Sequence, residues 1–412
     1  MTEFIIVFKN FIYKLERLIK MTDKIKELAK KYSAEIMAAR EYFHANPGIE
    51  FQEFETTKKI IETLEKYGIE YEKDIAVTGI LAIVRGKKDG KTVLLRGDMD
   101  ALPIEEEADV PYKSTVKGVM HACGHDSHAA GLLGAALILN DLKDEISGNI
   151  KFAFQPAEEN QGGAEPMIKA GILENPKVDA AFGLHVWGPY PEGKAITMKG
   201  PMMAAPDNIR IKLIGKGGHA SMPNELIDPV VMAAEVILSL QTIVSRKINP
   251  LDPVVISCST IHGGSAQNVI PNEVEITGTV RTLNEEVRKK MPALMEQTIK
   301  GITDIYNGSY EFDYHWGYPC LVNDGKSTEI LMSSAEKILG AENVGTMKQP
   351  TMGGEDFSYF SQKVPSSFIF LGVAKDMSNP PVHHHPKFAF DSKNTVVSSE
   401  ILAQVAVDFL GE

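Results

Sequence analysis

The sequence predicts an α/β protein whose chain is interrupted by a smaller α+β domain. Three observations support this fold class. Strand 91–96 has a continuous apolar run at its centre, as strands covered on both faces of a sheet usually do. The stretch 208–316 instead follows the order β-α-β-β-α-β of a ferredoxin-like sandwich. Finally, a length of 412 residues exceeds what one hydrophobic core usually fills.

We expect three parts along the chain. Patterns of the α/β type occur before residue 203 and return after residue 317, which predicts one discontinuous domain around an insertion. Met21 is followed by Thr22 and Asp23, which are suitable helix caps, so our hypothesis is that translation naturally begins at Met21. An intact mass that includes residues 1–20 would contradict it. The expected parts are an N-terminal extension over 1–21, a discontinuous domain over 22–202 and 317–412, and an inserted domain over 203–316.

Helices and strands alternate in the discontinuous domain. Asn46-Pro47-Gly48 ends a first run of helically spaced apolar residues, and Gly68 ends the second. The polar stretch from His121 to His128 precedes an apolar helix, so we place this stretch in a loop. The expected helices are 23–44, 56–67, 131–142, 327–339 and 394–410, and the expected strands are 79–84, 91–96, 149–154, 180–184 and 367–371.

In the inserted domain, the expected strands have one solvent-exposed face. Residues 208–214 alternate polar and apolar side chains, which is typical of a sheet that contacts water on one side. The expected helices here are 228–245 and 284–306, and the expected strands are 208–214, 254–261, 273–282 and 310–316.

The composition restricts the partners and the compartment. A net charge of -12 at pH 7 disfavours a nucleic-acid surface or an anionic membrane as partner. The apolar run 4–8 is too short to span a bilayer and lacks the cleavage site of a secretory signal. Three scattered cysteines, Cys123, Cys258 and Cys320, fit a reducing compartment better than a disulfide framework. We therefore expect a cytoplasmic protein.

Acidic and imidazole side chains follow three predicted strands. Asp98 and Asp100 follow strand 91–96, the pair Glu158-Glu159 follows strand 149–154, and His185 follows strand 180–184. Ligand sites of open α/β sheets lie at such carboxyl ends. Alone, the aspartates could belong to a solvated turn and the glutamates to an ordinary surface pair. Their joint occurrence at successive strand ends predicts one site.

Cys123 and His125 are candidates for binding one cation from a loop. Thiolate and imidazole are the ligands that zinc and related transition metals favour. The alternative is a free thiol in a loop ahead of a helix. The pair Glu158-Glu159 strengthens the metal interpretation, because neighbouring side chains diverge. One of them can then bind a metal while the other acts as a base toward a water.

Several further polar residues are not required by the local structure expected around them. In the inserted domain they are His219 within a Gly-rich turn, Asn268 and Arg281. Each has a structural alternative, namely a hairpin histidine, a turn-forming asparagine and a solvated arginine. The triplet His383-His384-His385 lies between the last strand and the closing helix. It could bind metals adventitiously, but in this position it supplies the ligand that the centre still lacks.

From about residue 22 to its end, the chain resembles the metallo-amidohydrolases that include aminoacylases, hippurate hydrolase, plant auxin-conjugate hydrolases and thermostable archaeal carboxypeptidases. The order and number of matching stretches make this resemblance specific. The stretches are Arg96-Gly-Asp-Met-Asp-Ala-Leu-Pro103, Met120-His-Ala-Cys-Gly-His-Asp126, Phe154-Gln-Pro-Ala-Glu-Glu159, Gly183-Leu-His185, Gly217-Gly-His-Ala220, Gln267-Asn-Val-Ile-Pro271, Gly278-Thr-Val-Arg281, Gly353-Gly-Glu-Asp-Phe357 and His384-His-Pro386.

The resemblance implies a zinc-peptidase-like catalytic domain, a mixed sheet flanked by helices with a two-metal site, and an inserted lid domain that also dimerises. Within the triplet we choose His384, because the family places its ligand two residues before the position of Pro386. The resemblance places Asn268 and Arg281 at the free carboxylate of the substrate. It also implies that His219, reaching across a two-fold axis, donates to the oxyanion in the neighbouring subunit. The implied metal ligands are Cys123, His125, Glu159, His185 and His384, with Glu158 as the base.

These residues support hydrolysis of an amide whose amine half is an amino acid. Two divalent ions, zinc, manganese or cobalt, would lie about 3.5–4 Å apart, share a water and hold the substrate carbonyl against it. A thiolate bridges two ions more easily than an imidazole does, so we expect Cys123 to be the bridge, with its pKa lowered by the metals. Carboxylates that orient histidine ligands are expected at Asp98, Asp100, Asp126 and Asp356.

The sequence does not distinguish between two related reactions. One is hydrolysis of N-acyl-L-amino acids, as in aminoacylases, and the other is removal of C-terminal residues from short or N-blocked peptides, as in carboxypeptidases. A non-catalytic metal-binding protein on the same scaffold is disfavoured because Glu158 is present, and the acidic charge disfavours a two-metal nuclease. We expect a homodimer through the lid domain, or a higher oligomer, that acts on a small molecule without nucleic acid or membrane as partner.

Overall fold

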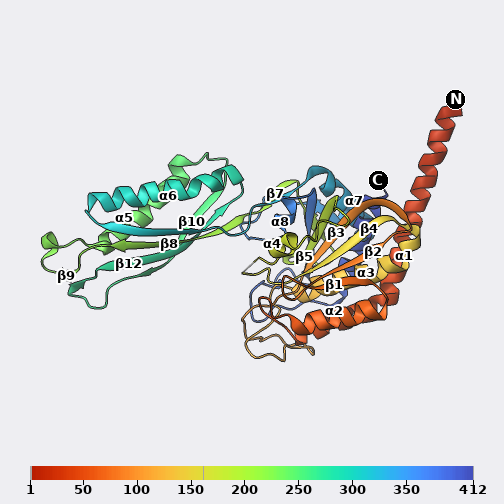
Figure 1. Cartoon of the computed structure of the whole chain (residues 1–412), viewed down its shortest axis with the longest axis horizontal. Coiled ribbons are helices and arrows are strands. Elements are labelled where there is room, and N and C mark those ends of the chain that lie inside the picture. The colour runs from red at the N-terminus through yellow and green to blue at the C-terminus, as the bar shows by residue number, and fades with distance from the viewer. Residues whose placement is uncertain (1, 161, 412) are drawn as a thin grey trace. The chain divides into compact units, whose positions relative to one another are not determined.

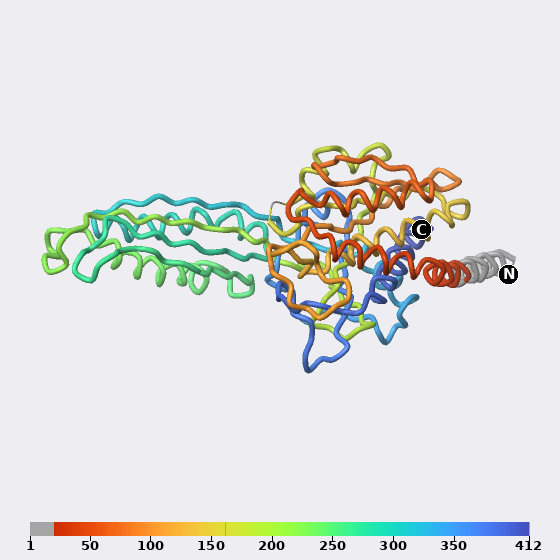
Figure 2. The backbone as a smooth tube through the Cα atoms, turned by 90° about the horizontal axis from the view of Figure 1, so that it is seen from below, coloured from red at the N-terminus to blue at the C-terminus, as the bar shows by residue number. Residues whose placement is uncertain are grey.

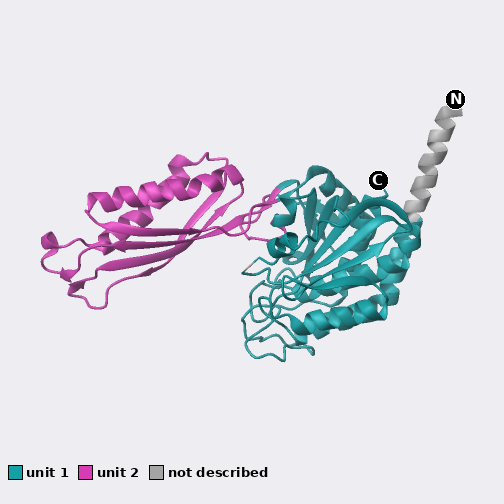
Figure 3. Ribbon diagram, viewed as in Figure 1, with its two compact units in different colours: residues 1–200, 322–348, 359–412 teal, residues 201–321, 349–358 magenta. Residues whose placement is uncertain are grey.

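A computed structural model describes the backbone of residues 2–160 and 162–411 and the side chains of residues 20–160 and 162–411. The chain divides into two compact units (Figure 3). The first contains residues 1–200, 322–348 and 359–412, and the second contains residues 201–321 and 349–358. The second unit thus includes a segment, 349–358, that lies within the discontinuous domain expected from the sequence. The expected domain boundaries stay predictions.

The first unit is built on a mixed β-sheet. Eight described strands form it: β1 (Glu70–Ile75), β2 (Gly79–Arg85), β3 (Lys88–Asp98), β4 (Ser147–Gln155), β5 (Ala180–Pro191), β6 (Ala195–Thr197), β15 (Val344–Thr346) and β16 (Ser366–Ala374). Their order is β1-β2-β4-β3-β5-β16-β6-β15. The central strands β4, β3, β5 and β16 run parallel, whereas β1 and β2 pair antiparallel at one edge. The predicted α/β class is confirmed.

Helices of the first unit pack on this sheet and on one another. They are α1 (Thr2–Ala45), α2 (Phe54–Lys66), α3 (His125–Asp141), α4 (Ala164–Lys169), α7 (Gly325–Leu339) and α9 (Lys393–Leu410). The helices α1, α3 and α9 contact one another, and Figure 2 shows the first and last of them side by side. Gly134 permits the close approach of α1 and α3, because a Cβ there would lie 2.6 Å from Ile36 Cδ1. These contacts form the core of the unit.

Two element boundaries differ from the prediction in ways that matter for the site. Helix α3 begins at His125 rather than near residue 131. Its first turn is polar but buried, so apolar periodicity does not reveal where the helix starts. Strand β5 continues through His185 to Pro191, so His185 lies inside the strand rather than after its end. The helix expected over 23–44 is part of α1, which the structure describes from Thr2.

The second unit has the β-α-β-β-α-β order expected from the sequence (Figure 1). Its main elements are β8 (Ala205–Ile214), α5 (Pro229–Thr242), β10 (Val254–His262), β12 (Glu273–Thr282), α6 (Glu285–Ile305) and β13 (Ser309–His315). The four strands form an antiparallel sheet in the order β10-β12-β8-β13. A side chain caps the N-terminus of each helix. Asp228 Oδ1 accepts from Val230 N–H at 2.8 Å at the start of α5, and Asn284 Oδ1 accepts from Glu286 N–H at 2.9 Å at the start of α6.

Shorter elements complete the chain. In the second unit, β9 (Gly218–His219) pairs with β11 (Val269–Ile270). Near the points where the chain changes unit lie β7 (Gly200–Met203), β14 (Leu321–Asn323) and α8 (Ser358–Ser361). The first unit also holds short helical turns at Lys143–Glu145 and Ala341–Asn343, and the second holds turns at Pro223–Glu225 and Ile243–Lys247.

Candidate metal centre

The first unit brings the five expected metal ligands together. Cys123 Sγ lies 3.5 Å from His185 Nε2. Glu159 lies between two imidazoles, with Oε1 3.9 Å from His125 Nε2 and Oε2 3.3 Å from His384 Nε2. The ligand atoms form two groups, each within 4.8 Å: Cys123 with His125 and His185, and Cys123 with Glu159 and His384. Since Cys123 belongs to both groups, one sulfur is shared between two sets of ligands.

Adjacent elements deliver these side chains to one edge of the sheet. Strand β3 pairs in parallel with β4 on one side and β5 on the other, so their carboxyl ends meet at one edge. Glu158 and Glu159 follow the end of β4, and His185 lies in β5. His125 is the first residue of α3. His384 comes from the loop between β16 and α9, which completes the ligand set from a distant part of the chain.

Two loops at the centre have backbones that suit few residues. Gly124 has a φ of 98°, and a Cβ there would lie 2.4 Å from Val186 Cγ2. The turn between Cys123 and α3 therefore requires glycine. His384 has a φ of 60°, which is unusual for a residue with a side chain, and its N–H donates to Ala122 O at 2.9 Å. Strain of this kind persists where the surroundings hold it, commonly at functional sites.

Two buried atoms of the centre have no hydrogen-bond partner among the described residues. They are His125 Nε2 and Glu159 Oε1. The opposite nitrogen of His125, Nδ1, lies 3.0 Å from both O and Oδ1 of Asp100. Asp100 Oδ2 in turn accepts from Glu159 N–H at 3.0 Å. A buried polar atom without a partner costs roughly 1–3 kcal/mol, so both atoms fit cation ligands, and Asp100 orients the residues that carry them.

Burial and nearby charges set the protonation of the ligands. Burial raises the pKa of Cys123 well above its usual value, and Glu159 adds to this shift. Burial lowers the pKa of His185, and His128 adds to that shift, so His185 stays in the neutral form that binds metals. At His125 burial opposes the charged form, yet Asp98 and Cys123 raise its pKa. The protein alone thus favours the thiol at Cys123, and a bound cation would favour the thiolate.

His128 is a member of the centre that no sequence pattern considered above indicates. Its Nδ1 lies 2.6 Å from Asp98 Oδ1, and its Nε2 accepts from Val186 N–H at 2.9 Å. Asp98 Oδ2 accepts from Arg96 Nη1 at 2.5 Å and lies 3.7 Å from His125 Nε2. His128 and Arg96 therefore hold Asp98 behind the ligand His125. The spacing of three between His125 and His128 would reveal this once the helix is known to start at His125.

The hydrogen bonds of Asp126 differ from its expected role, which is to orient a histidine ligand of the metal. Its Oδ2 lies 3.1 Å from Arg40 Nε and 2.9 Å from His44 Nδ1, and its described hydrogen bonds include no predicted metal ligand. His44 Nε2 also lies 3.0 Å from Glu106 Oε1. These four side chains are buried, so their charges neutralise one another inside the protein. Asp126 thus joins the start of α3 to α1.

This buried network predicts that stability falls as the pH rises above about 6.5. Burial opposes the charged form of His44, but Asp126 and Glu106 raise its pKa to about 9. The unfolded chain has a histidine pKa of about 6.5. Because the folded value is the higher one, the stabilisation is complete below pH 6.5 and is lost as the pH rises through 9. The difference corresponds to roughly 3 kcal/mol.

Urea unfolding of the chelator-treated protein at pH 6.5 and pH 9.5 checks this. We expect the free energy of unfolding to decline less in His44→Gln than in the parent. His385→Gln, which changes an exposed histidine, is the control and should follow the parent. His121 should not interfere, because burial lowers its pKa to about 4, and it stays neutral over this range. Parallel pH profiles for the parent and His44→Gln would contradict the prediction.

The remaining expected residues belong to the second unit. His219 lies in β9 opposite Val269 of β11, and Ala220 N–H donates to Asn268 O at 3.0 Å. His219 and Asn268 are therefore neighbours on one exposed two-stranded ribbon. Ser221 N–H donates to His219 Nδ1 at 3.2 Å, so the proton of the neutral ring is on Nε2.

Asp356 lies in the segment 349–358 of the second unit.

Arg281 is half-buried on β12. The Nη1 atom of Arg281 contacts the Thr279 hydroxyl, and it lies 3.4 Å from Val280 O and 3.5 Å from Asp207 O. In the part of the chain that the structure describes, no carboxylate is among its hydrogen-bond partners. Its guanidinium is thus available for a carboxylate supplied from outside.

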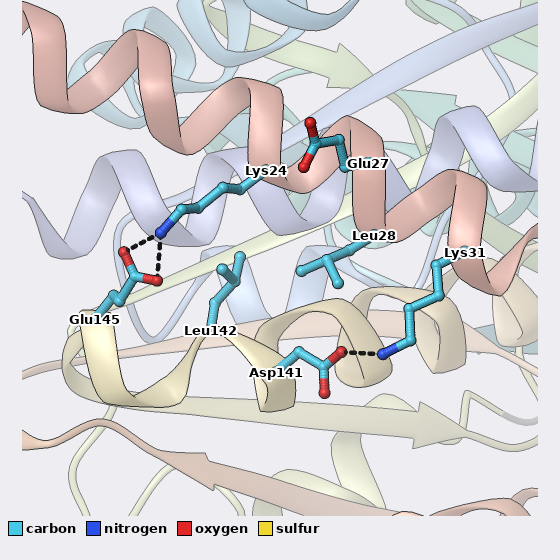
Figure 4. Close-up of a pocket in the computed structure, with 7 residues that line it drawn as sticks. All are labelled: Lys24, Glu27, Leu28, Lys31, Asp141, Leu142 and Glu145. Carbon is cyan, nitrogen blue, oxygen red and sulfur yellow. Dashed lines mark hydrogen bonds and ion pairs between the residues drawn. The ribbon is translucent and has the colours of Figure 1, made fainter.

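A surface hollow elsewhere in the first unit has a different character. It lies between α1 and the end of α3 (Figure 4). Lys24 Nζ lies 2.5 Å from Glu145 Oε1, and Lys31 Nζ lies 2.7 Å from Asp141 Oδ2. Because both lysines are paired with carboxylates, the hollow does not offer an anion site. The Lys31–Asp141 pair links α1 to the end of α3, and the Lys24–Glu145 pair links α1 to the turn Lys143–Glu145.

The fold and the two ligand groups define the class of metal-dependent hydrolases, and comparisons with known proteins agree. Residues 94–408 match the model of peptidase family M20/M25/M40. The chain is 42% identical over 394 residues to thermostable carboxypeptidase 2 of Saccharolobus solfataricus, covering 94% of this chain and 99% of that protein. It is 45% identical over 302 residues to the N-acyl-L-amino acid amidohydrolase of Geobacillus stearothermophilus, covering 73% and 81%.

A solved structure agrees as well. The YXEP protein of Bacillus subtilis, described as a dinuclear metal binding peptidase from the M20 family, matches with a TM-score of 0.80 and 34% identity over 92% of this chain and 99% of that chain. The chain therefore belongs to peptidase family M20/M25/M40, and it is a metal-dependent hydrolase. The family resemblance expected from the sequence is confirmed, and a non-catalytic metal-binding role is not favoured.

Proposed function

We propose that this hydrolase cleaves the amide bond of N-acyl-L-amino acids, or of the C-terminal residue of short or N-blocked peptides, with two divalent ions per subunit. The observation that carries the proposal is the pair of ligand groups sharing Cys123. The relatives named as a carboxypeptidase and an N-acyl-L-amino acid amidohydrolase support the substrate class. The description of the YXEP protein as dinuclear supports the number of ions.

The residues of the centre fit two divalent ions. Cys123 would bridge them, with His125 and His185 completing one group and Glu159 and His384 the other. When bound, the ions lower the pKa of a water and polarise the amide carbonyl. Thiolate, imidazole and carboxylate together suit zinc, manganese or cobalt.

Within the histidine triplet we assign the ligand to His384. Its Nε2 lies 3.3 Å from Glu159 Oε2, beside the shared sulfur. His383 Nε2 instead accepts from Gly188 N–H at 3.0 Å. His385 is exposed, and its Nδ1 accepts from a backbone N–H at 3.1 Å. Of the three rings, that of His384 is thus the one whose nitrogen approaches the carboxylate ligand Glu159.

Glu158 would act as the general base. It is 7% exposed, and its Oε2 lies 4.0 Å from His125 Nε2, next to the ligand Glu159. Its carboxylate takes a proton from the water as the water oxygen bonds to the amide carbon. It then gives the proton to the amine nitrogen as the carbon–nitrogen bond breaks. The products are a carboxylic acid and a free amino acid.

His219 and Asn268 would act on the neighbouring subunit of a homodimer. The proton on Nε2 of His219 suits donation to the oxyanion. Two features of the second unit support pairing between copies: α5 exposes apolar side chains, including Leu238 at 70%, and β10 lies at the edge of its sheet.

The helical segment Pro229–Lys247 is long and apolar enough to cross a membrane, by length and composition alone. We attribute its apolar character to the core of the second unit and to subunit contact.

We further propose a cytoplasmic location. Its support is that Cys123, Cys258 and Cys320 are all free thiols. Free cysteines are typical of a reducing compartment.

Arg281 would bind the free carboxylate of the substrate. A charge-assisted hydrogen bond contributes roughly 1.5–3 kcal/mol, so Arg281→Ala should lower kcat/KM for N-acyl amino acids by about 10- to 100-fold, chiefly through KM. Steady-state kinetics on free acids and on the matching amides would measure this, and the amides should be poor substrates for both proteins. Arg210→Ala, at an arginine already paired with Glu275 and Asp313, is the matched control. Efficient cleavage of amides by the parent would contradict the role.

A turnover screen tests the proposed function as a whole. Acetyl-, benzoyl- and benzyloxycarbonyl-amino acids would be assayed beside dipeptides, after chelation and after adding back zinc, manganese or cobalt. We expect chelation to abolish hydrolysis and at least one metal to restore it. The preferred substrates decide between the aminoacylase and carboxypeptidase types. Failure of every metal with both substrate classes would refute the proposal.

A further inference from the structure

His383 directly precedes the assigned ligand His384, yet the chemistry above gives it no role. Its ring is enclosed by aromatic neighbours, with centroid distances of 4.8 Å to both Trp187 and Phe388. Its Nδ1 lies 3.9 Å from Cys123 Sγ, within the range of a hydrogen bond to sulfur. An imidazole held so near the shared sulfur can either donate a hydrogen bond to it or bind a metal itself.

The backbone determines which nitrogen of His383 carries the proton. Gly188 N–H donates to His383 Nε2 at 3.0 Å, so Nε2 is unprotonated and Nδ1 carries the hydrogen of the neutral ring. Gly188 is held tightly, because a Cβ there would lie 1.9 Å from Pro381 O. The atom directed at Cys123 is therefore an N–H group, and a protonated ring nitrogen has no lone pair for a cation.

We propose that His383 is a positioning residue that donates an N–H···S hydrogen bond to the Cys123 thiolate and thereby tunes the metal-bridging sulfur. This inference rests on the proposed metal binding by Cys123. Hydrogen bonds from residues around a metal centre orient its ligands and adjust their electron donation. A thiolate that accepts such a bond holds its lone pairs more tightly. It therefore donates less charge to the ions and keeps a fixed direction between the two ligand groups.

Cobalt(II) provides a readout that does not depend on activity. Charge transfer from a bound thiolate to Co²⁺ absorbs light at an energy set by the sulfur lone pair. The metal-free parent, His383→Phe and His385→Phe would each be titrated with Co²⁺. Phenylalanine keeps a ring between Trp187 and Phe388 but has no N–H. His385→Phe is the matched control, because it removes an exposed imidazole of the same triplet whose described partner is the N–H of Lys387.

We expect the charge-transfer band of His383→Phe to move to longer wavelength, with two Co²⁺ per subunit retained, and that of His385→Phe to stay in place. An unmoved band in His383→Phe would overturn the proposal. Loss of one Co²⁺ in His383→Phe but not in His384→Phe would also overturn it, because His383 would then be the ligand. By contrast, a parent without the band, or a band that survives in Cys123→Ser, would refute metal binding by Cys123 and hence the proposed function.

A second measurement does not require a stable His383 variant. In the parent labelled with ¹⁵N-histidine, His383 and His128 should both be Nδ1–H tautomers, because each accepts a backbone N–H at Nε2. In Cys123→Ser, the Nδ1 proton of His383 should shift more than that of His128. A proton on Nε2 of His383 would overturn the proposal.

Discussion

Replacing Glu158 by glutamine is expected to lower kcat by about 100-fold or more while leaving the metal content unchanged. Glutamine keeps the size of the side chain and one acceptor oxygen, but it cannot take the proton of the attacking water. The metal content should persist, because Glu158 lies outside the two ligand groups that share Cys123. Steady-state kinetics and metal analysis of the same preparation measure both quantities.

Two further variants separate the base from its neighbours. Glu159→Gln should lose metal, because Glu159 belongs to a ligand group with Cys123 and His384. Glu165→Gln changes a half-exposed acid paired with Lys169 on α4 and should match the parent. Near-normal turnover of Glu158→Gln would remove Glu158 from the chemistry, and loss of its metal would instead place Glu158 among the ligands.

Mixed dimers of a Glu158→Ala subunit and a His219→Ala subunit are expected to regain activity that neither homodimer shows. If His219 serves the neighbouring subunit, both substitutions affect one site and the other site is intact. A hybrid isolated with two different affinity tags should then reach about half of the parental activity per dimer, as isologous pairing requires. The measurement is the turnover of the purified hybrid beside both homodimers.

The hybrid of a Glu158→Ala subunit with a parental subunit provides the reference value, because it also contains one intact site. A hybrid of the two variants that stays as inactive as the homodimers would show that His219 acts within its own chain. The exposed ribbon that carries His219 and Asn268 would then need another explanation.

The sequence predicted the acidic residues of the centre because they lie at or just after the ends of buried strands. The buried residues 92–97 of β3 and 150–155 of β4 precede these side chains: Asp98 closes β3, Asp100 follows it, and Glu158 and Glu159 follow β4. The family motifs added His384, whose loop has no periodic signal of its own. Adjacency of the strands then follows from the parallel pairing that such apolar runs favour.

Other features depend on contacts that no local pattern contains. The start of α3 at His125 was missed, since its polar first turn is buried against partners from other elements. His44 and Asp126 are 82 residues apart, so their hydrogen bond cannot be inferred from spacing. The partner of His128, Asp98, lies on a different element as well. The orientation of His383 depends on one backbone N–H, that of Gly188, which side-chain identity does not reveal.

The way the chain is shared between the two units limits how the gene can be recombined with those of its relatives. The chain passes from one unit to the other after residues 200, 321, 348 and 358. A chimera that exchanges only residues 201–321 would join a foreign unit to a resident segment 349–358, with side chains selected for a different neighbour. A crossover scheme that keeps each unit intact must therefore transfer 201–321 and 349–358 together, as two blocks from one parent.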